Sequence, residues 1–306
     1  MDRIAFTIGN IIIYKYAVCI VCGIILAIIL GAILFKRAGI EPDFILVIFL
    51  YAVPTAIIFA RLGYVLPRLG NEFKTFADIV AIRGGGLTIT TGIVGGALAV
   101  ILACLIHKKS IFRIGDLLAA PLLVGQAIGR LGNYFNQELY GKVIETKIFE
   151  PIGIKIGSSP ELHHPLFAYE GILNALMALV IIFLIFKFLP RVNYKDKNAV
   201  YAHLGDLLSS KYEDKLKPGT IVFLYFTWYP LIRGLLEALK DRTNPPFAIN
   251  GVMVIQAISL IVAPLMLLCL TLVSLGYLKL ESSHMKIRHF KLIDNLQTKN
   301  NESIYV

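Results

Sequence analysis

The residues best suited to chemistry lie in the stretch Gly129-Arg-Leu-Gly-Asn-Tyr-Phe-Asn-Gln-Glu-Leu-Tyr-Gly141. Arg130, Asn133 and Glu138 follow an apolar run that begins near Ile114, so they stand where a membrane-spanning helix should end. Charged and amide side chains at that depth are unfavourable unless they are paired or functional. A guanidinium beside backbone amides is suited to binding a phosphate group. The alternative interpretation is a buried polar cluster that only ties helices together.

The composition is that of a membrane protein. Apolar residues make up 57% of the chain and charged residues 16%, and the mean hydropathy is +0.73. These values exclude an ordinary soluble globular domain. The net charge is +10, but the basic residues lie in short loops and a tail between apolar runs. The pattern therefore indicates membrane topology and contact with anionic lipid, and no motif that reads RNA or DNA argues for nucleic-acid binding.

Seven apolar segments are long enough to cross a bilayer, which takes about 20 residues. They lie near residues 11–35, 44–66, 86–106, 114–131, 167–189, 219–239 and 252–276. The sequence thus predicts an all-α integral membrane protein with seven transmembrane helices. The cysteines lie in these segments without polar neighbours, so we expect small buried apolar residues rather than a redox pair, a metal site or disulfides. They are Cys19, Cys22, Cys104 and Cys269.

The basic residues also predict the orientation of the chain. Lysine and arginine are commoner after the first, third, fifth and seventh segments than in the other loops. By the positive-inside rule, the N-terminus lies outside and the C-terminus in the cytoplasm. We expect a membrane domain over residues 1–278, with an extracytoplasmic segment at 134–166 and a cytoplasmic loop at 190–218, followed by a polar cytoplasmic tail at 279–306. A small hairpin is predicted near 152–157 and a membrane-surface helix near 201–212.

With this orientation, six segments direct their unusual polar groups to the outer leaflet. These groups are Tyr14, Tyr16, Arg61, Tyr64, residues 84–92, residues 130–138, His163, His164, Tyr169, Glu170, Tyr229, Arg233 and Glu237. Their common depth predicts one site that is open to lipid, and disfavours a transport path across the membrane. Structural alternatives remain. Arg233 and Glu237 have the spacing of an i,i+4 ion pair, Arg61 has the length to snorkel to the headgroups, and His163 is expected at the surface.

The same residues resemble the motifs of a known family. The stretch from Gly129 to Gly141 resembles the signature of the prolipoprotein diacylglyceryl transferases. Further motifs follow in the family's order: Tyr16, Ala60-Arg-Leu-Gly-Tyr64, the glycine-rich residues 84–92, His164-Pro-Leu-Phe-Ala-Tyr-Glu170 and Tyr229-Pro-Leu-Ile-Arg-Gly-Leu-Leu-Glu237. The resemblance covers about residues 8–276. Several spaced motifs in one order make it specific.

The resemblance implies an enzyme of the bacterial cytoplasmic (inner) membrane that catalyses the first step of lipoprotein maturation. It would transfer the diacylglyceryl group of phosphatidylglycerol to the lipobox cysteine in the signal peptide of a prolipoprotein. The products would be a thioether and glycerol phosphate, and no cofactor or metal would take part. The implied partners are therefore phosphatidylglycerol, prolipoprotein signal peptides and membrane lipid, and nucleic acid is not among them.

The resemblance also implies roles for individual residues. Catalytic roles would fall to Arg130, Arg233, Glu138, Tyr229 and Glu237. Phosphatidylglycerol would be bound by Arg130, Asn133, Gly141, Tyr16 and Arg233. The two arginines would hold the phosphate, because each guanidinium offers a planar fork of donors.

One position departs from the family pattern. Alignment on Gly85-Gly86 places Thr90 where many members have the histidine of Gly-Gly-x-x-x-His-Gly-Gly, and a hydroxyl cannot act as a general base near neutral pH. Three alternatives follow: the histidine is dispensable here, Glu138, Glu237 or His164 replaces it, or the chain is a paralogue that acts on a different acceptor. A non-catalytic lipid-binding protein is a further alternative, which the intact charged residues disfavour.

Overall fold

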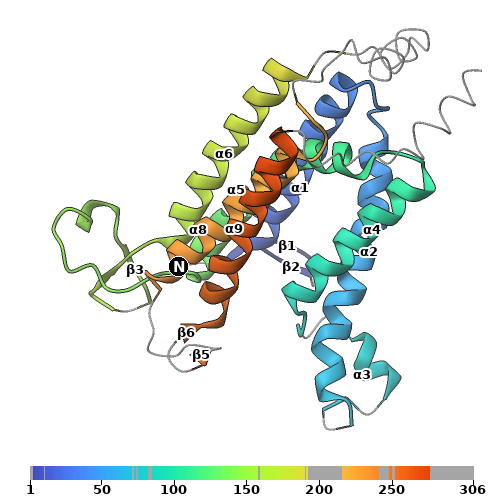
Figure 1. Cartoon of the computed structure of the whole chain (residues 1–306). Coiled ribbons are helices and arrows are strands. Elements are labelled where there is room, and N and C mark those ends of the chain that lie inside the picture. The colour runs from blue at the N-terminus through green and yellow to red at the C-terminus, as the bar shows by residue number, and fades with distance from the viewer. Residues whose placement is uncertain are drawn as a thin grey trace, which may run out of the picture.

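The computed structural model describes residues 3–9, 11–70, 72–73, 75–81, 85–157, 159–189, 191, 216–240, 248–249 and 252–275. Within these residues the protein is mostly helical (Figure 1). The long helices are α1 (Lys15–Arg37), α2 (Phe44–Val65), α4 (Ile89–Ile106), α5 (Ile111–Asn136), α6 (Leu166–Phe188), α8 (Thr220–Glu237) and α9 (Val254–Leu275). The short elements are β1 (Ile4–Ile8), β2 (Ile11–Tyr14), η1 (Leu66–Arg68), α3 (Phe76–Val80), η2 (Glu150–Ile152), β3 (Ile154–Lys155), β4 (Leu162–His163), β5 (Ala248–Ile249) and β6 (Val252–Met253).

In the described part of the chain, five helices are long and apolar enough to cross a membrane. They are α1, α2 continued by η1, α4, α5 and α6. Helices suit a membrane because their backbone N–H and C=O groups are hydrogen-bonded to each other within the helix, and lipid tails cannot provide such hydrogen bonds. The predicted all-α membrane protein is thereby confirmed. Helices α8 and α9 occupy the sixth and seventh predicted segments, and the count of seven spans and their orientation stay predictions.

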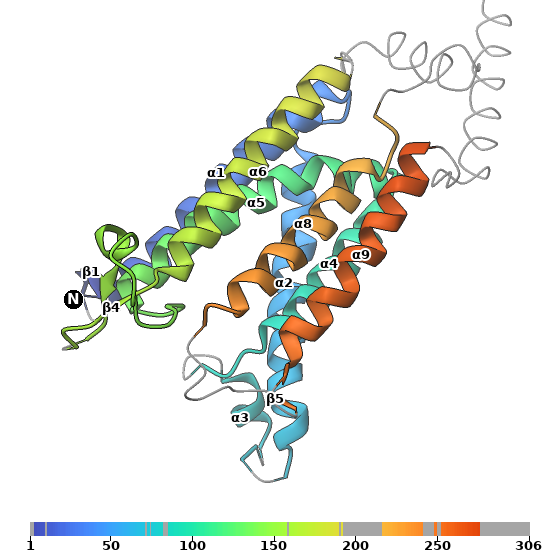
Figure 2. The same ribbon diagram turned by 60° about the vertical axis from the view of Figure 1, so that its left-hand side comes forward.

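Most neighbouring long helices pack antiparallel. α1 lies along α5, α5 along α6, α2 along α4 and α8 along α9, while α8 also contacts α5 and runs parallel to it (Figure 2). Figure 2 shows that the start of α1, the end of α5, the start of α6 and the end of α8 all point toward the same end of the bundle. Small residues permit these contacts: a Cβ on Gly23 would lie 3.1 Å from the Gly125 carbonyl oxygen. The predicted polar residues are therefore collected at one end.

At the opposite end, one buried carboxylate joins α5 to α8. Asp116 is 1% exposed, and it accepts hydrogen bonds of 2.9 Å from the backbone N–H groups of Gly219, Ile221 and Val222. The first N–H groups of a helix have no partner within that helix, so a carboxylate from a neighbour can satisfy them. Asp116 thus fixes the start of α8 against α5.

Two segment boundaries differ from the sequence prediction. The first helix begins at Lys15 because Ile11–Tyr14 pairs antiparallel with Ile4–Ile8, and runs of isoleucine favour strands. Helix α5 extends to Asn136, so residues 129–136 of the polar stretch form its last turns and residues 137–141 follow it. The predicted small hairpin is present as a pairing of Ile154–Lys155 with Leu162–His163.

Other sequence predictions have mixed outcomes. Cys104 is buried as expected, but Cys22 is exposed on the outside of α1, so the prediction of a buried thiol was wrong there. The predicted surface helix at 201–212 and the tail at 279–306 lie outside the described residues.

The capping role of Asp116 is testable. In Asp116→Ala, three buried N–H groups lose their acceptor, and each such loss costs about 1–3 kcal/mol. We expect a marked fall in the thermal unfolding temperature of the purified protein in detergent. The matched control is Asp43→Ala, because Asp43 stands at the N-cap of α2 but its side chain makes no cap hydrogen bond. Equal unfolding temperatures for the two variants would contradict the role.

Candidate active site

The centre of the candidate site is a buried carboxylate between two arginines from different helices. Glu170 on α6 is 1% exposed, and its Oε1 lies 2.5 Å from Arg130 Nη2 of α5. Its Oε2 lies 3.2 Å from Arg233 Nη1 of α8. The side chains of Arg130 and Arg233 are a quarter and a fifth exposed. We call these three side chains the Arg130–Glu170–Arg233 cluster. It joins three helices by charge-assisted hydrogen bonds.

Close helix packing brings the cluster together. Gly171 follows Glu170, and a Cβ at this glycine would lie 3.4 Å from both the Ala127 carbonyl oxygen and Arg130 Cβ. The absence of a side chain therefore lets α6 approach α5 beside Arg130. The start of α6 is also tied to the segment after α5, since Phe167 N–H donates to the Leu139 carbonyl over 3.1 Å.

A second carboxylate, Glu237, extends the cluster along α8. Its Oε2 lies 3.6 Å from Arg233 Nη2, one turn earlier, and its Oε1 lies 3.4 Å from Lys240 Nζ. The i,i+4 pair suggested by the spacing therefore exists. Glu237 is as buried as Glu170, so its charge is held by two cations inside the protein.

Tyr229 connects α8 to the other side of the cluster. It lies one turn before Arg233, and its hydroxyl interacts with the Arg130 side chain. Its ring stacks on that of Tyr225 with centroids 6.0 Å apart, and the Tyr225 hydroxyl accepts a 2.8 Å hydrogen bond from Gln126 of α5. These contacts hold the Tyr229 phenol beside the arginines.

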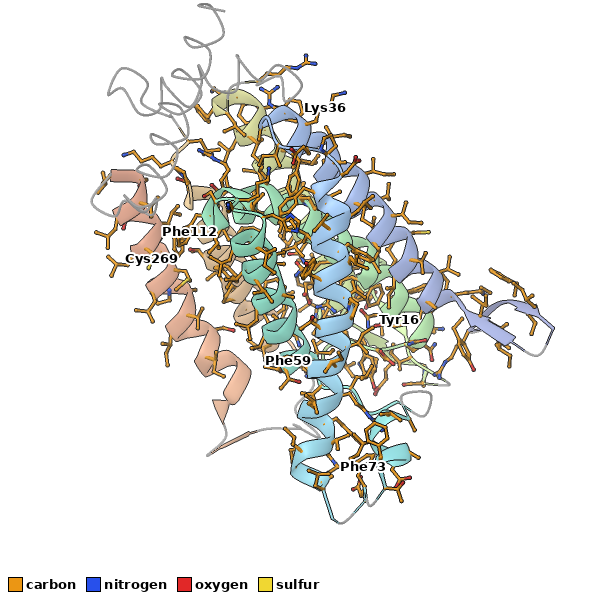
Figure 3. The ribbon with its side chains drawn as sticks, turned by 90° about the vertical axis from the view of Figure 1, so that its right-hand side faces the viewer. Tyr16, Lys36, Phe59, Phe73, Phe112 and Cys269 are labelled. Carbon is orange, nitrogen blue, oxygen red and sulfur yellow. The ribbon has the colours of Figure 1, made fainter. Side chains whose placement is uncertain are left out.

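Tyr16 lies against the polar end of α5. A Cβ on Gly132 would meet the Tyr16 ring at 2.5 Å, so only glycine permits this contact. The next residue, Asn133, is buried, and its amide Nδ2 lies 3.5 Å from Glu138 Oε2. Figure 3 shows Tyr16 toward the end of the molecule that also holds Phe73, away from Lys36. Tyr16 thus packs against the turn of α5 that carries Asn133.

Glu138 lies in a reversed turn just beyond α5. The residues on either side, Gln137 and Leu139, have left-handed backbone angles, with φ of 54° and 55°. Such angles are unfavourable for residues with side chains and often occur at functional sites. Glu138 is exposed. Its carboxylate accepts hydrogen bonds from the side-chain amides of Asn133 and Asn136, and it makes no ion pair in the part of the chain that the structure describes.

Gly141 is enclosed by backbone. Its N–H donates to the His164 carbonyl over 2.8 Å, and a Cβ there would lie 2.6 Å from the Leu239 carbonyl oxygen. His163 Nδ1 lies 2.9 Å from the Gly141 carbonyl oxygen, and His163 is buried. The prediction of a surface position for His163 was therefore wrong. Gly141 therefore lies where the end of α5, the start of α6 and the end of α8 meet.

Two further predicted residues lie on the α2–α4 pair. Arg61 is buried, and it donates to the carbonyls of Ile79, Gly85, Gly86 and Asp78 over 2.7–3.0 Å. The snorkelling alternative is therefore wrong, because the guanidinium organises the loop before α4. Thr90 is exposed in the first turn of α4. Among the described residues, none of the recorded ion pairs or hydrogen bonds joins Arg61 or Thr90 to the Arg130–Glu170–Arg233 cluster.

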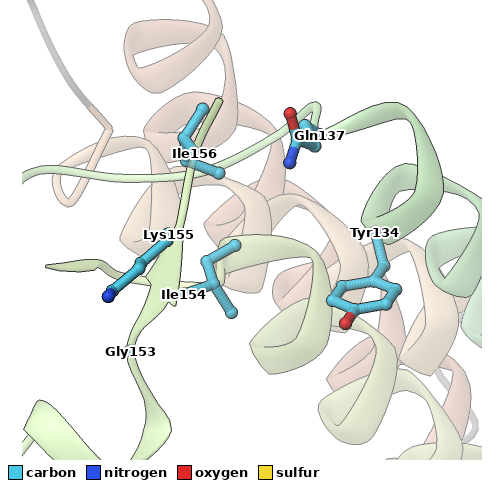
Figure 4. Close-up of a pocket in the computed structure, with 6 residues that line it drawn as sticks. All are labelled: Tyr134, Gln137, Gly153, Ile154, Lys155 and Ile156. Carbon is cyan, nitrogen blue, oxygen red and sulfur yellow. The ribbon is translucent and has the colours of Figure 1, made fainter. Parts of the chain in front are cut away.

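A hollow of about 340 Å³ lies beyond the end of α5 (Figure 4). It is lined by Tyr134, Gln137, Gly153, Ile154, Lys155 and Ile156. The Gln137 side-chain oxygen accepts a hydrogen bond from Gly157 N–H over 3.2 Å, which ties the turn after α5 to the β3 segment. The cluster itself does not line this hollow, so the two are separate features.

The resemblance implied no role for Glu170, although the residue belongs to the motif His164–Glu170. One signal was present: a carboxylate inside an apolar helix needs a counter-ion, and no ionic partner was suggested for Arg130.

Fold and site together define a membrane protein with a cationic polar site at one end of its helices. The model of the family "Prolipoprotein diacylglyceryl transferase" matches residues 3–273. A phosphatidylglycerol–prolipoprotein diacylglyceryl transferase of Bifidobacterium adolescentis is 36% identical over 256 residues, which are 77% of this chain and 68% of the relative. The corresponding transferase 1 of Clostridium perfringens is 31% identical over 265 residues, 85% of this chain and 90% of the relative. The chain belongs to the prolipoprotein diacylglyceryl transferase family, which confirms the resemblance.

The role of Glu170 as shared counter-ion is testable. In Glu170→Gln, two partly buried guanidiniums lose their compensating charge, and breaking a buried pair typically costs about 3–5 kcal/mol. We expect a large fall in unfolding temperature. The matched control is Glu72→Gln, because Glu72 pairs with Arg68 at 3.7 Å with a largely exposed side chain, and exposed pairs contribute at most about 1 kcal/mol. The role is refuted if Glu170→Gln is as stable as the control.

Proposed function

We propose that the chain transfers the diacylglyceryl group of phosphatidylglycerol to the lipobox cysteine of prolipoproteins, and that the Arg130–Glu170–Arg233 cluster binds the phosphate. Membership of the family supports the reaction. The observation that carries the site is the convergence of two arginines on one buried carboxylate. Each guanidinium has five N–H donors, and the contacts with Glu170, Glu237 and Tyr229 use only part of them, so donors remain for a ligand. Arg130 Nε is buried and has no hydrogen-bond partner among the described residues.

The charges of the cluster fit a phosphodiester. The two arginines and Glu170 together carry a net charge of +1, and the sum remains +1 when Glu237 and its second partner Lys240 are included. A phosphodiester carries one negative charge, so the bound state is close to neutral. Tyr16, Asn133, Gly141 and Tyr229 complete the proposed headgroup pocket.

In the proposed reaction, the cysteine sulfur attacks the carbon of the diacylglyceryl group that is bonded to a phosphate oxygen. A carbon–sulfur bond forms, the carbon–oxygen bond breaks, and its electron pair leaves with glycerol phosphate. The arginines stabilise the charge that develops on the phosphate. The thiol proton goes to a base, and we assign that role to Glu138, which makes no ion pair with any residue that the structure describes. Glu237 is held by two cations, and His164 Nδ1 lies 3.0 Å from the Tyr169 hydroxyl.

We further propose seven spans in a membrane domain of residues 1–278, with the N-terminus outside and the active site at the outer leaflet of the bacterial cytoplasmic membrane. The common direction of the polar helix ends supports this arrangement (Figure 2). An exported signal peptide and phosphatidylglycerol can meet at that leaflet. We place the peptide around the lipobox cysteine in the hollow beside β3. This hollow lies beyond the end of α5, and its lining side chains and backbone can contact a peptide.

A transfer assay tests the function. The purified protein is mixed with phosphatidylglycerol micelles and a synthetic lipobox peptide, and lipidated peptide and glycerol phosphate are measured. We expect turnover by the wild type and a loss of about 100-fold or more in Arg130→Ala, by analogy with the removal of one donor from a site that stabilises developing charge. Arg130→Lys keeps the charge but loses the planar fork, so we expect an intermediate rate.

The matched control is Arg68→Ala, because Arg68 is an exposed arginine at the end of the same bundle whose recorded ion pair is with Glu72. It should keep the wild-type rate. Wild-type turnover in Arg130→Ala would refute the assignment of the phosphate site. Binding of phosphatidylglycerol without lipidated peptide would refute the acceptor and favour the paralogue, for which Thr90 at the family's histidine position is the supporting observation.

A further inference from the structure

The N-terminal hairpin of β1 and β2 is unusually apolar and unusually exposed. All five residues of β1 are exposed, and Phe6 and Ile8 have exposed fractions of 50% and 61%. In β2, Ile12 and Tyr14 are about half exposed. Thr7 and Tyr14 are the polar side chains within the two strands. Such a surface is not expected to face water.

Both faces of the hairpin are apolar. The pairing of Phe6 with Ile13 places these two residues on one face together with Ile8, and Thr7 pairs with Ile12 on the other face. None of the strand residues belongs to the buried clusters of the helix bundle in the described part of the chain. In Figure 3 the hairpin projects sideways from the start of α1, beside Tyr16. An isolated two-stranded hairpin is at best marginally stable in water, so a partner must cover it.

The surroundings identify lipid as that partner. The hairpin runs directly into α1, a candidate membrane span whose exposed residues Ile20, Val21 and Ile25 form an apolar surface. Two cations stand at its base, where Lys15 N–H donates to the Arg3 carbonyl over 2.9 Å. The end of a span lies at the level of the phosphate headgroups. Apolar side chains that project sideways with basic residues at that level are typical of segments that lie in the membrane interface.

We propose that the β1–β2 hairpin lies in the bilayer interface at the site end of the bundle. Phe6, Ile8 and Ile12 contact acyl chains, and Arg3 and Lys15 contact anionic headgroups. The hairpin ends at Tyr14, two residues before Tyr16, so its immersion fixes the depth of Tyr16 and of the adjoining end of α5 relative to the lipid. The proposal rests on the membrane-spanning character of α1 and is independent of the transferase activity.

Tryptophan fluorescence of the whole protein in vesicles tests the proposal. The chain has one tryptophan, Trp228, so the wild-type spectrum can be subtracted. Ile8→Trp is reconstituted in phosphatidylglycerol-containing vesicles with or without lipids brominated on the acyl chains. We expect blue-shifted emission of the added tryptophan, at least two-fold quenching by brominated lipid, and little quenching by aqueous iodide.

The matched control is Ile148→Trp, because Ile148 is 84% exposed in the segment after α5. Its emission should be red-shifted, quenched by iodide and insensitive to brominated lipid. The proposal is overturned if Ile8→Trp behaves like the control. It is also overturned if Ile8→Trp is shielded only after addition of an apolar signal peptide, which would make the hairpin an acceptor-docking surface. Shielding that requires a high protein-to-lipid ratio would instead show contact between two copies of the chain.

Discussion

The interaction on which the site depends is the sharing of one buried carboxylate by two arginines. Arg130 reaches Glu170 from α5 and Arg233 reaches it from α8, and both helices contact α6. Two guanidiniums this close would repel each other strongly in a medium of low dielectric constant. The carboxylate removes half of their charge and fixes the position of both forks before any ligand arrives. Preorganised donors need no reorganisation when charge develops on a bound group. This electrostatic stabilisation is usually the largest single contribution to the rate enhancement of an enzyme.

The net charge of +1 also distinguishes the stages of the proposed reaction. The phosphodiester of phosphatidylglycerol carries one negative charge, whereas the departing phosphate monoester carries between one and a half and two charges near neutral pH, since its second pKa is about 6. A cluster that just balances the substrate therefore attracts the leaving group more strongly than the substrate. Stabilisation that grows along the reaction coordinate raises the rate, while equal binding of both states does not. Partial exposure of both guanidiniums gives water access to the product.

Helix α8 is held at both ends, and this sets the register of the site. Asp116 caps its first turn from α5, and Arg233 reaches Glu170 near its last turn. About 14 residues separate these anchors, or about 21 Å of helix. A shift of α8 along α5 would break one set of bonds or the other. The distant cap thus contributes to the geometry of the cluster without touching it.

Much of the fold could be predicted from the sequence, because apolar runs of this length have few alternatives in lipid. The sequence also predicted that Tyr16, Arg130 and Arg233 lie at the same end of the helices, because successive membrane spans alternate in direction. The pairing at Glu170 could not, because residues 40 and 63 positions apart in the chain carry no signal of contact. His163 was misplaced because its burial depends on the folded-back 141–166 segment. The β1–β2 hairpin was missed because Ile11–Tyr14 continues the apolar run of α1.

The position of Thr90 bears on where the thiol proton goes. Thr90 lies on α4, which packs mainly against α2, while the cluster lies on α5, α6 and α8. Within the proposed reaction, the proton has two acceptors that do not involve α4. One is the carboxylate of Glu138, which accepts hydrogen bonds from the amides of Asn133 and Asn136. The other is the leaving phosphate, whose second pKa of about 6 lets it take up a proton near neutral pH. Since the negative charge forms at the arginines and the proton can leave with the product, a histidine at position 90 is not required by this chemistry.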